Sequence, residues 1–184
     1  MIQVFTGPMY GAKSLKLIEV YQYTINKKKD NVMCFKPSID VRDFAKIASR
    51  NHTLELDATV IDNLSEIKEH LTDKTQVILI DEAQFLHGSE KELLDLSLLG
   101  YDIYVAGLAC TSEQTPFGIM PNIMAIANSI VHSKARCDDC ENWNAEYTYC
   151  IAEKSGEILV GSEQYIALCE NCLRKRVRIK GVKK

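Results

Sequence analysis

One stretch constrains the fold of this chain more than any other: Gly7-Pro8-Met9-Tyr10-Gly11-Ala12-Lys13-Ser14. It follows the apolar run Ile2–Thr6 and precedes the helix-like run Leu15–Val20, so it would join a buried strand to a helix. In such a loop the backbone N–H groups and the helix N-terminus together attract phosphate. The pattern G-x-x-x-x-G-K-S/T is broken only where Ala12 replaces the second glycine. A methyl group is the smallest such departure, and Gly11 would supply freedom one residue earlier, so we predict a nucleotide-binding loop over residues 7–14.

Two side chains of this loop have the chemistry that a nucleotide requires. Lys13 would reach the β- and γ-phosphates, and the Ser14 hydroxyl would be a ligand of Mg²⁺. The alternative is a chance turn at the end of a strand. The loop is the more specific interpretation because strand and helix patterns flank it on the expected sides.

The first two thirds of the chain alternate strand-like and helix-like patterns. Apolar runs rich in β-branched and aromatic residues lie at Ile2–Thr6, Asn31–Phe35, Thr59–Ile61, Gln76–Asp81 and Tyr101–Ala106. Helical patterns between them begin with the capping pairs Asn63/Glu66 and Ser89/Glu92. Strands that alternate with helices predict an α/β fold, with a parallel sheet covered on both faces. We predict a nucleotide-binding domain of the P-loop NTPase type over residues 1–130.

Two acids follow one of these runs. Gln76–Asp81 ends in Asp81 and is followed by Glu82, and we expect this strand to lie beside the first one, with both acids facing the nucleotide. Because side chains alternate along a strand, the two acids should have different roles. Asp81 would orient Mg²⁺ through water, and Glu82 would accept a proton from an attacking hydroxyl. Without the loop, two acids after a strand would more often be solvent-exposed.

Two C-x-x-C pairs lie in the last third of the chain: Cys137 with Cys140, and Cys169 with Cys172. Four thiolates that converge with no further donor are typical of a closed structural zinc site. Two disulfides or a redox pair are the alternatives. Outside this quartet, Cys34, Cys110 and Cys150 are predicted to be free thiols. We predict a zinc-binding lobe over residues 131–175.

Composition narrows the class of protein further. The 184 residues carry a formal net charge of −3, which disfavours bulk electrostatic binding of nucleic acid. Residues 176–184 are expected to form a basic, solvated tail. The start of the chain lacks the features of a signal peptide, and no apolar run is long enough to span a membrane. With seven cysteines, this predicts a cytoplasmic protein in a reducing compartment.

These motifs occur in one order together with Asp81-Glu82-Ala83-Gln84-Phe85, Gly107-Leu108 and Thr115-Pro116-Phe117-Gly118. The combination resembles the thymidine kinases of the zinc-containing, cytosolic type, over nearly the whole chain. The resemblance implies transfer of the γ-phosphoryl group of ATP to the 5′-hydroxyl of thymidine or deoxyuridine, with Mg²⁺ at the site and zinc in the lobe. It also implies a homotetramer as the usual assembly.

The resemblance assigns roles where the residues match the family pattern. Asp40 and Arg42 match an Asp-x-Arg element, in which Asp contributes to the metal environment and Arg to transition-state charge. Lys13 and Ser14 match the phosphate and Mg²⁺ positions, and Glu82 matches the general base. The positions expected around the nucleoside are Met9, Phe85, Leu108, Phe117, Thr148 and Tyr165, of which the last two belong to the segment that closes over it. For the aromatic residues and Met9, plain core packing is the alternative.

Five departures from the family pattern all touch the nucleotide or the nucleoside. Ser112 replaces a stacking aromatic ring, whose loss could weaken base binding by about 1–3 kcal/mol. Cys150 replaces an arginine, and Val160 replaces a glycine. The others are Ala12 and the stretch Ser49-Arg50-Asn51-His52. The alternatives are therefore a kinase with altered base preference, a catalytically impaired nucleotide-binding relative and, from another class, a zinc-ribbon module that binds nucleic acid.

Overall fold

The computed structural model describes residues 1–26, 32–40, 45–49, 53–152 and 163–181. Six parallel strands form its central sheet, in the order β5-β2-β6-β7-β1-β8. Their bounds are Ile2–Thr6 for β1, Val32–Pro37 for β2, Thr59–Ile61 for β5, Val77–Ile80 for β6, Asp102–Ala106 for β7 and Ser129–His132 for β8. The predicted α/β class with a parallel sheet is confirmed.

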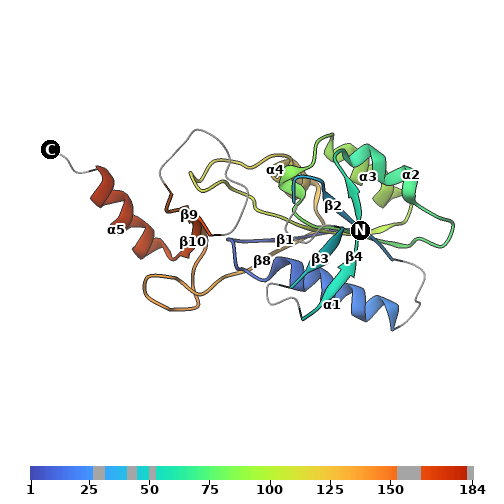
Figure 1. Cartoon of the computed structure of the whole chain (residues 1–184). Coiled ribbons are helices and arrows are strands. Elements are labelled where there is room, and N and C mark those ends of the chain that lie inside the picture. The colour runs from blue at the N-terminus through green and yellow to red at the C-terminus, as the bar shows by residue number, and fades with distance from the viewer. Residues whose placement is uncertain (27–31, 41–44, 50–52, 153–162, 182–184) are drawn as a thin grey trace.

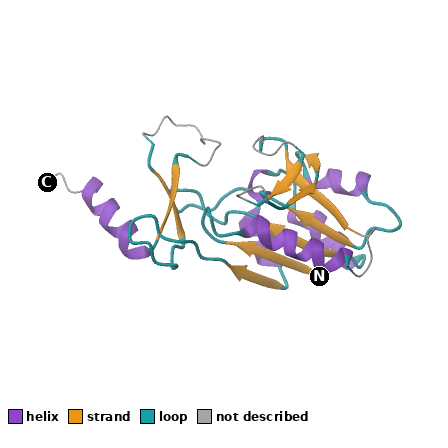
Figure 2. Ribbon diagram, turned by 60° about the horizontal axis from the view of Figure 1, so that its bottom comes forward, coloured by secondary structure: helices purple, strands orange, loops and turns teal. Residues whose placement is uncertain are grey.

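Helices cover both faces of this sheet (Figures 1 and 2). One face carries α1 (Lys13–Ile25) and a small hairpin of β3 (Lys46–Ala48) and β4 (Glu55–Asp57). The other face carries the 3-10 turn η1 (Leu64–Glu66), α2 (Ile67–His70), α3 (Glu90–Leu98) and α4 (Met120–Ile126). The sheet therefore separates two layers of packing.

Strand alternation divides the core between these layers. Ile78 and Ile80 point to one face and pack with Leu93 of α3, whereas Leu79 between them packs with Leu17 of α1 on the other. All five side chains are fully buried. The central strands read as continuous apolar runs because both of their faces are covered.

The predicted capping residues begin the helical segments on the second face. Asn63 and Glu66 form the capping box at the start of η1. Ser89 caps α3 through its side chain, but Glu92 forms an ion pair with Lys68 at 2.7 Å instead of completing a second box. That ion pair joins α2 to α3, and local sequence patterns could not predict it because the two residues are far apart in the chain.

The sheet differs from the sequence-based expectation at two places. We expected β6 to lie directly beside β1, but β7 lies between them. Strand order depends on long-range pairing, which local patterns do not reveal. β8 was not predicted, because Ser129–His132 is a short, exposed edge strand without a buried apolar run. It also crosses the proposed domain boundary at residue 130.

Beyond β8 the chain forms a lobe of its own, at the left of Figure 1. β9 (Tyr147–Cys150) and β10 (Tyr165–Leu168) pair antiparallel, and α5 (Glu170–Gly181) follows. Residues predicted as a basic tail are thus helical as far as Gly181.

One arginine holds α5 against the rest of the lobe. Arg176 forms two hydrogen bonds with the carboxylate of Asp139, at 2.5 and 2.8 Å, and lies 5.7 Å from the ring centroid of Tyr149. The guanidinium lowers the pKa of Asp139. These contacts hold α5 beside the turn that contains Cys137 and Cys140.

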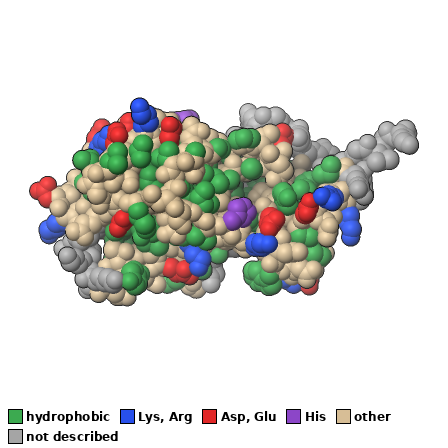
Figure 3. Space-filling view, turned by 180° about the vertical axis from the view of Figure 1, so that it is seen from behind, with side chains coloured by type: hydrophobic (Ala, Val, Ile, Leu, Met, Phe, Trp, Pro, Cys, Tyr) green, Lys and Arg blue, Asp and Glu red, His purple; other side chains and the backbone are tan. Residues whose placement is uncertain are grey.

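On the face seen in Figure 3, acidic and basic side chains of the described residues are interspersed, with hydrophobic side chains between them. Among the described helices, none combines the length and apolar character needed to cross a membrane.

Candidate active site

Unusual backbone angles shape the loop of residues 7–14. φ is +139° at Gly7, +67° at Tyr10 and +55° at Ala12. A Cβ at Gly7 would lie 2.3 Å from the backbone oxygen of Ser133, so only glycine fits there. Gly11 does not adopt a positive φ. The expected compensation at Gly11 is therefore wrong, and Ala12 itself takes the left-handed conformation as the N-cap of α1.

Ala12→Gly should raise the free energy of unfolding by about 1 kcal/mol, because alanine is strained in the left-handed region. Urea denaturation measures this change. Ala125→Gly is the matched control: the same change in the right-handed helix α4 should lower stability by about 0.5–1 kcal/mol. A loss of stability at both positions would contradict the strain at Ala12.

The loop meets the acid at the end of β6 through Ser14. The Ser14 hydroxyl donates a hydrogen bond to Asp81, and Lys13 Nζ donates to the Pro8 carbonyl at 2.7 Å. Burial of Asp81, followed by the charge of Glu82, raises the pKa of Asp81 to about 7, although the Ser14 hydrogen bond opposes this. The ionised carboxylate would therefore be stabilised by a nearby cation.

A buried ion pair lies near Asp81. Lys36 Nζ lies 3.1 Å from Asp40 Oδ2, and the two side chains are 1% and 6% exposed. Lys36 Nζ also donates to the backbone oxygen of Lys46 at 3.0 Å. The charge of Asp40 contributes to the raised pKa of Asp81, which places these two carboxylates near one another. Arg42, the partner of Asp40 in the expected motif, lies outside the described residues, as do residues 50–52 and Val160.

Lys36→Met should lower the free energy of unfolding by about 3–5 kcal/mol, because it removes the cation that pairs with the buried Asp40 carboxylate. Chemical denaturation measures the loss, and adding Asp40→Asn should restore part of it. Lys46→Met is the matched control, since Lys46 pairs with Glu55 in an exposed position and its loss should matter far less. Equal losses in the two variants would contradict this account of the buried pair.

Magnesium fits the groups that gather here. The Ser14 hydroxyl and the carboxylates of Asp40 and Asp81 form an all-oxygen set of donors, which is the type that Mg²⁺ prefers. These groups come from the loop, from the end of β2 and from the end of β6. The carboxyl ends of parallel strands meet at one edge of the sheet, which is why they converge.

Glu82 follows Asp81 and is partly exposed. Its φ of +49° turns the chain into the 3-10 turn η2 (Ala83–Phe85). Gln84 Nε2 donates to Glu82 Oε2 at 2.5 Å, and Gln84 Oε1 accepts from the N–H of Leu108 at 2.9 Å. Gln84 received no role from sequence reasoning. The only signal was its place in the quoted motif, two residues after the proposed base.

The six predicted nucleoside residues fall into two groups. Phe85 and Phe117 form an edge-to-face pair with ring centroids 5.3 Å apart, and the backbone N–H of Leu108 donates to Gln84, the residue before Phe85. The other three lie where the loop meets the lobe. Of all six, only Thr148 is buried, and the other five are partly exposed. Partial exposure argues against plain core packing for Met9 and the aromatic residues.

Hydrogen bonds between described residues connect the lobe to the rest of the site. Met9 N–H donates to Thr148 Oγ1 at 2.9 Å, and Tyr10 Oη donates to the backbone oxygen of Tyr165 at 2.9 Å. Gln114 Nε2 donates to the backbone oxygen of Thr148 at 3.0 Å. The hairpin of β9 and β10 is thereby held against the loop of residues 7–14.

A cavity of about 190 Å³ lies beside these bonds. Thr148 is the one predicted nucleoside residue that lines it, together with the start of the loop, residues 109–111, Gln114, His132, Glu146 and Tyr147. Thr6 also lines it, and its buried Oγ1 has no hydrogen-bond partner among the described residues. Sequence reasoning missed Gln114, His132 and Glu146, because they come from three separate segments and belong to no local motif.

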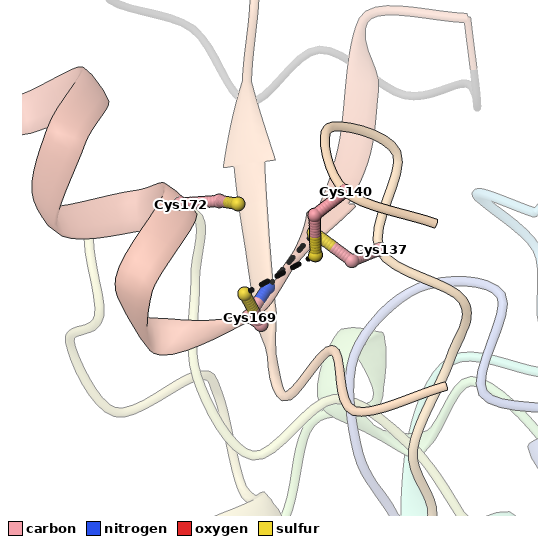
Figure 4. A group of neighbouring side chains, drawn as sticks. All are labelled: Cys137, Cys140, Cys169 and Cys172. Carbon is pink, nitrogen blue, oxygen red and sulfur yellow. Dashed lines mark hydrogen bonds between the residues drawn. The ribbon is translucent and has the colours of Figure 1, made fainter. Parts of the chain in front are cut away.

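The four cysteines converge in the lobe (Figure 4). Their Sγ atoms all lie within 4.8 Å of one another, and Cys140 and Cys169 Sγ are 3.8 Å apart. Tetrahedral ligands at the usual zinc–sulfur distance would be about 3.8 Å apart, whereas a disulfide would bring two sulfurs to about 2 Å. The geometry therefore fits zinc, and the described cysteines are all free thiols.

Electrostatics of the cluster also favour a cation. Burial opposes ionisation of Cys137, but backbone N–H groups of Cys169, Cys140 and Asp139 lower its pKa to about 6. Burial and the three neighbouring sulfurs raise the pKa of Cys172 to about 12. Four adjacent thiolates repel one another, so full ionisation requires a bound metal.

The three remaining cysteines lie outside the cluster. Cys34 is buried in the core beside α1, and burial raises its pKa to about 12. Cys110 is exposed and Cys150 is partly exposed. Core packing therefore accounts for Cys34 alone.

Comparison with known proteins covers both parts of this site. The family model described as thymidine kinase matches residues 1–173. The thymidine kinase of Pseudothermotoga lettingae is 31% identical over 180 residues, which is 95% of each chain. The thymidine kinase of Mycoplasma mobile is 33% identical over 177 residues, 94% of this chain and 86% of the relative. The match spans the loop of residues 7–14, the two acids after β6 and the four-cysteine lobe, and the chain belongs to the thymidine kinase family.

Proposed function

We propose that the protein transfers the γ-phosphoryl group of ATP to the 5′-hydroxyl of thymidine. The observation that carries the proposal is the hydrogen bond from Ser14 of the loop to Asp81, with Glu82 directly beside it. It brings the phosphate-binding end of the site within reach of a carboxylate that can accept a proton. Membership in the thymidine kinase family supports the same reaction.

The loop of residues 7–14 binds the phosphates of ATP through its backbone N–H groups and the N-terminus of α1. Lys13, which donates to the Pro8 carbonyl, turns toward the β- and γ-phosphates and forms charge-assisted hydrogen bonds with them. Arg42 is proposed to stabilise charge on the moving phosphoryl group. Catalysis is then mainly positioning and electrostatic stabilisation, as is general for phosphoryl transfer.

Glu82 accepts the proton of the 5′-hydroxyl as that oxygen bonds to the γ-phosphorus and the bond to the β-phosphate oxygen breaks. Ser14, Asp40 and Asp81 would hold Mg²⁺, because together they offer oxygen ligands. When bound, Mg²⁺ neutralises charge on the phosphate oxygens. The zinc of the cysteine lobe is structural, because four protein ligands leave no open position.

The thymine ring is proposed to lie between the two groups of nucleoside residues. One is Phe85, Leu108 and Phe117 on the α/β domain, and the other is Met9, Thr148 and Tyr165 at the lobe. Partly exposed apolar and aromatic side chains can exchange water for a flat ring. The hydrogen bond from Met9 to Thr148 joins the loop to the lobe. The proposed phosphate-binding and base-binding parts of the site are therefore in direct contact.

A cytoplasmic location and a homotetramer are part of the proposal. The edge strand β8 offers one surface for assembly, since Ile130 and Val131 are 45% and 36% exposed. Size-exclusion chromatography with light scattering measures the number of subunits.

Purified protein with ATP, Mg²⁺ and each natural nucleoside tests the reaction, with products identified by mass. Thymidine monophosphate with stoichiometric ADP is the expected result. Preferred phosphorylation of another nucleoside would support altered base preference instead. Binding by calorimetry without ADP release would identify an impaired relative.

A further inference from the structure

Gln84 occupies a buried position between the acid segment and the next loop. It lies in η2, two residues after Glu82, and only 3% of it is exposed. The ends of β6 and β7 bring η2 beside the segment Gly107–Gly118. A long polar side chain in such a position must have its hydrogen-bonding groups satisfied.

The orientation of the Gln84 amide follows from its partners. The Leu108 N–H, 2.9 Å away, can only donate, so the atom that faces it must be Oε1. Nε2 then faces Glu82 Oε2 at 2.5 Å, and an ionised carboxylate can only accept. The amide thus fixes one oxygen of the Glu82 carboxylate.

Two glycines leave room for this arrangement. A Cβ at Gly107 would lie 2.8 Å from Gln84 Oε1. A Cβ at Gly118, where φ is +50°, would lie 2.0 Å from the backbone oxygen of Gln84. Both ends of the segment Gly107–Gly118 therefore pack against Gln84. Phe117, just before Gly118, contacts Phe85, which follows Gln84.

We propose that Gln84 is the positioning residue for Glu82, and that it couples the orientation of this base to the segment Gly107–Gly118. The inference rests on the proposed function, in which Glu82 accepts the proton of the 5′-hydroxyl. Gln84 acts through Glu82 and has no proposed contact with the nucleoside or the phosphates. It holds the carboxylate through Nε2 and is itself held through Oε1 by Leu108, one of the proposed nucleoside contacts. A nucleoside that packs on Leu108 and Phe117 would thereby restrict the orientation of the Glu82 carboxylate.

Gln84→Met tests the proposal, because methionine matches the length of glutamine but makes neither hydrogen bond. We expect kcat to fall about 10- to 100-fold, since misplacing a catalytic group by about 1 Å can cost 100-fold. The dissociation constant of thymidine, measured by calorimetry, should stay within about twofold. Gln76→Met is the matched control, because Gln76 is exposed just before β6, at the opposite end of that strand.

Gln84→Glu provides a second variant if the methionine variant does not fold. It retains an acceptor for Leu108 but places a carboxylate against Glu82, so kcat should fall at least as far. Adding Gln84→Met to Glu82→Gln should cause no further loss of residual turnover, because the group that Gln84 positions is already gone. Additive losses would mean that Gln84 acts only as a structural residue, and the proposal would be wrong.

Assays of the wild-type protein distinguish a failure of the positioning role of Gln84 from a failure of the proposed function. If it phosphorylates thymidine and Gln84→Met turns over at the same rate, the positioning role is wrong while the proposed function stands. If it releases no ADP with any nucleoside, the proposed function fails first and the positioning role loses its basis.

Discussion

Glu82→Gln should lower kcat by about 10²–10⁴-fold while thymidine still binds, because a positioned general base contributes about that much to the rate. Glutamine has nearly the same shape, and its amide oxygen can still accept from Gln84 Nε2, so the turn η2 should remain intact. What is lost is the ability to take up the proton of the 5′-hydroxyl. The effect should appear in kcat rather than in nucleoside affinity.

Single-turnover assays and calorimetry with thymidine measure the two quantities separately. Glu69→Gln, an exposed acid on α2, is the matched control and should leave both unchanged. Unaltered turnover in Glu82→Gln would remove the assignment of the base. A parallel loss of thymidine binding would instead show that Glu82 holds the nucleoside.

Removing the metal from the cysteine cluster should unfold the lobe. Zinc binding contributes about 10–16 kcal/mol to the folding free energy of small zinc domains. Few buried side chains in this lobe could supply that stability without the metal. The lobe's own core is small: apart from the cysteines, the buried residues packed within it are Ala135, Ala145, Tyr149, Ala167 and Leu168. Loss of the lobe would also break the bonds from Met9 to Thr148 and from Tyr10 to Tyr165. Thymidine affinity should therefore fall along with the structure.

Elemental analysis should find one zinc per chain, and hydrogen exchange after chelation should show lost protection at β9 and β10. Cys169→Ser should reproduce the effect of chelation. Cys110→Ser, an exposed cysteine outside the cluster, should keep the zinc content unchanged. A chain without metal that still protects β9 and β10 would contradict a structural zinc site.

Local patterns predicted five strands of the central sheet, but not β8, the hairpin of β3 and β4, or the strands of the lobe. The five predicted strands each match an observed strand to within two residues, because apolar runs bounded by polar residues mark buried strands directly. Asn63 and Glu66 cap η1 as expected, since capping depends on neighbours in sequence. The cysteine pairs pointed to a metal cluster for the same reason: each pair supplies two ligands from one short turn.

Long-range arrangements escaped these patterns. Nothing in the apolar run of β7 shows that it inserts between β1 and β6. The ion pair of Lys36 with Asp40 is a contact over four residues, yet its burial depends on the β3–β4 hairpin that supplies the Lys46 carbonyl. Gln84 likewise acquires its role only when Leu108 arrives from the end of the next strand.

The amino-acid sequence by itself predicted the loop of residues 7–14, the acids after β6 and the cluster of four cysteines, because each depends on residues a few positions apart. Tertiary structure alone decided which strand lies between the loop and the acids, how the lobe contacts Met9 and Tyr10, and what orients Glu82. The physical reason is that strand pairing and buried hydrogen bonds join groups far apart in the chain. Such contacts are selected by the packing of the whole core, and no local spacing encodes them.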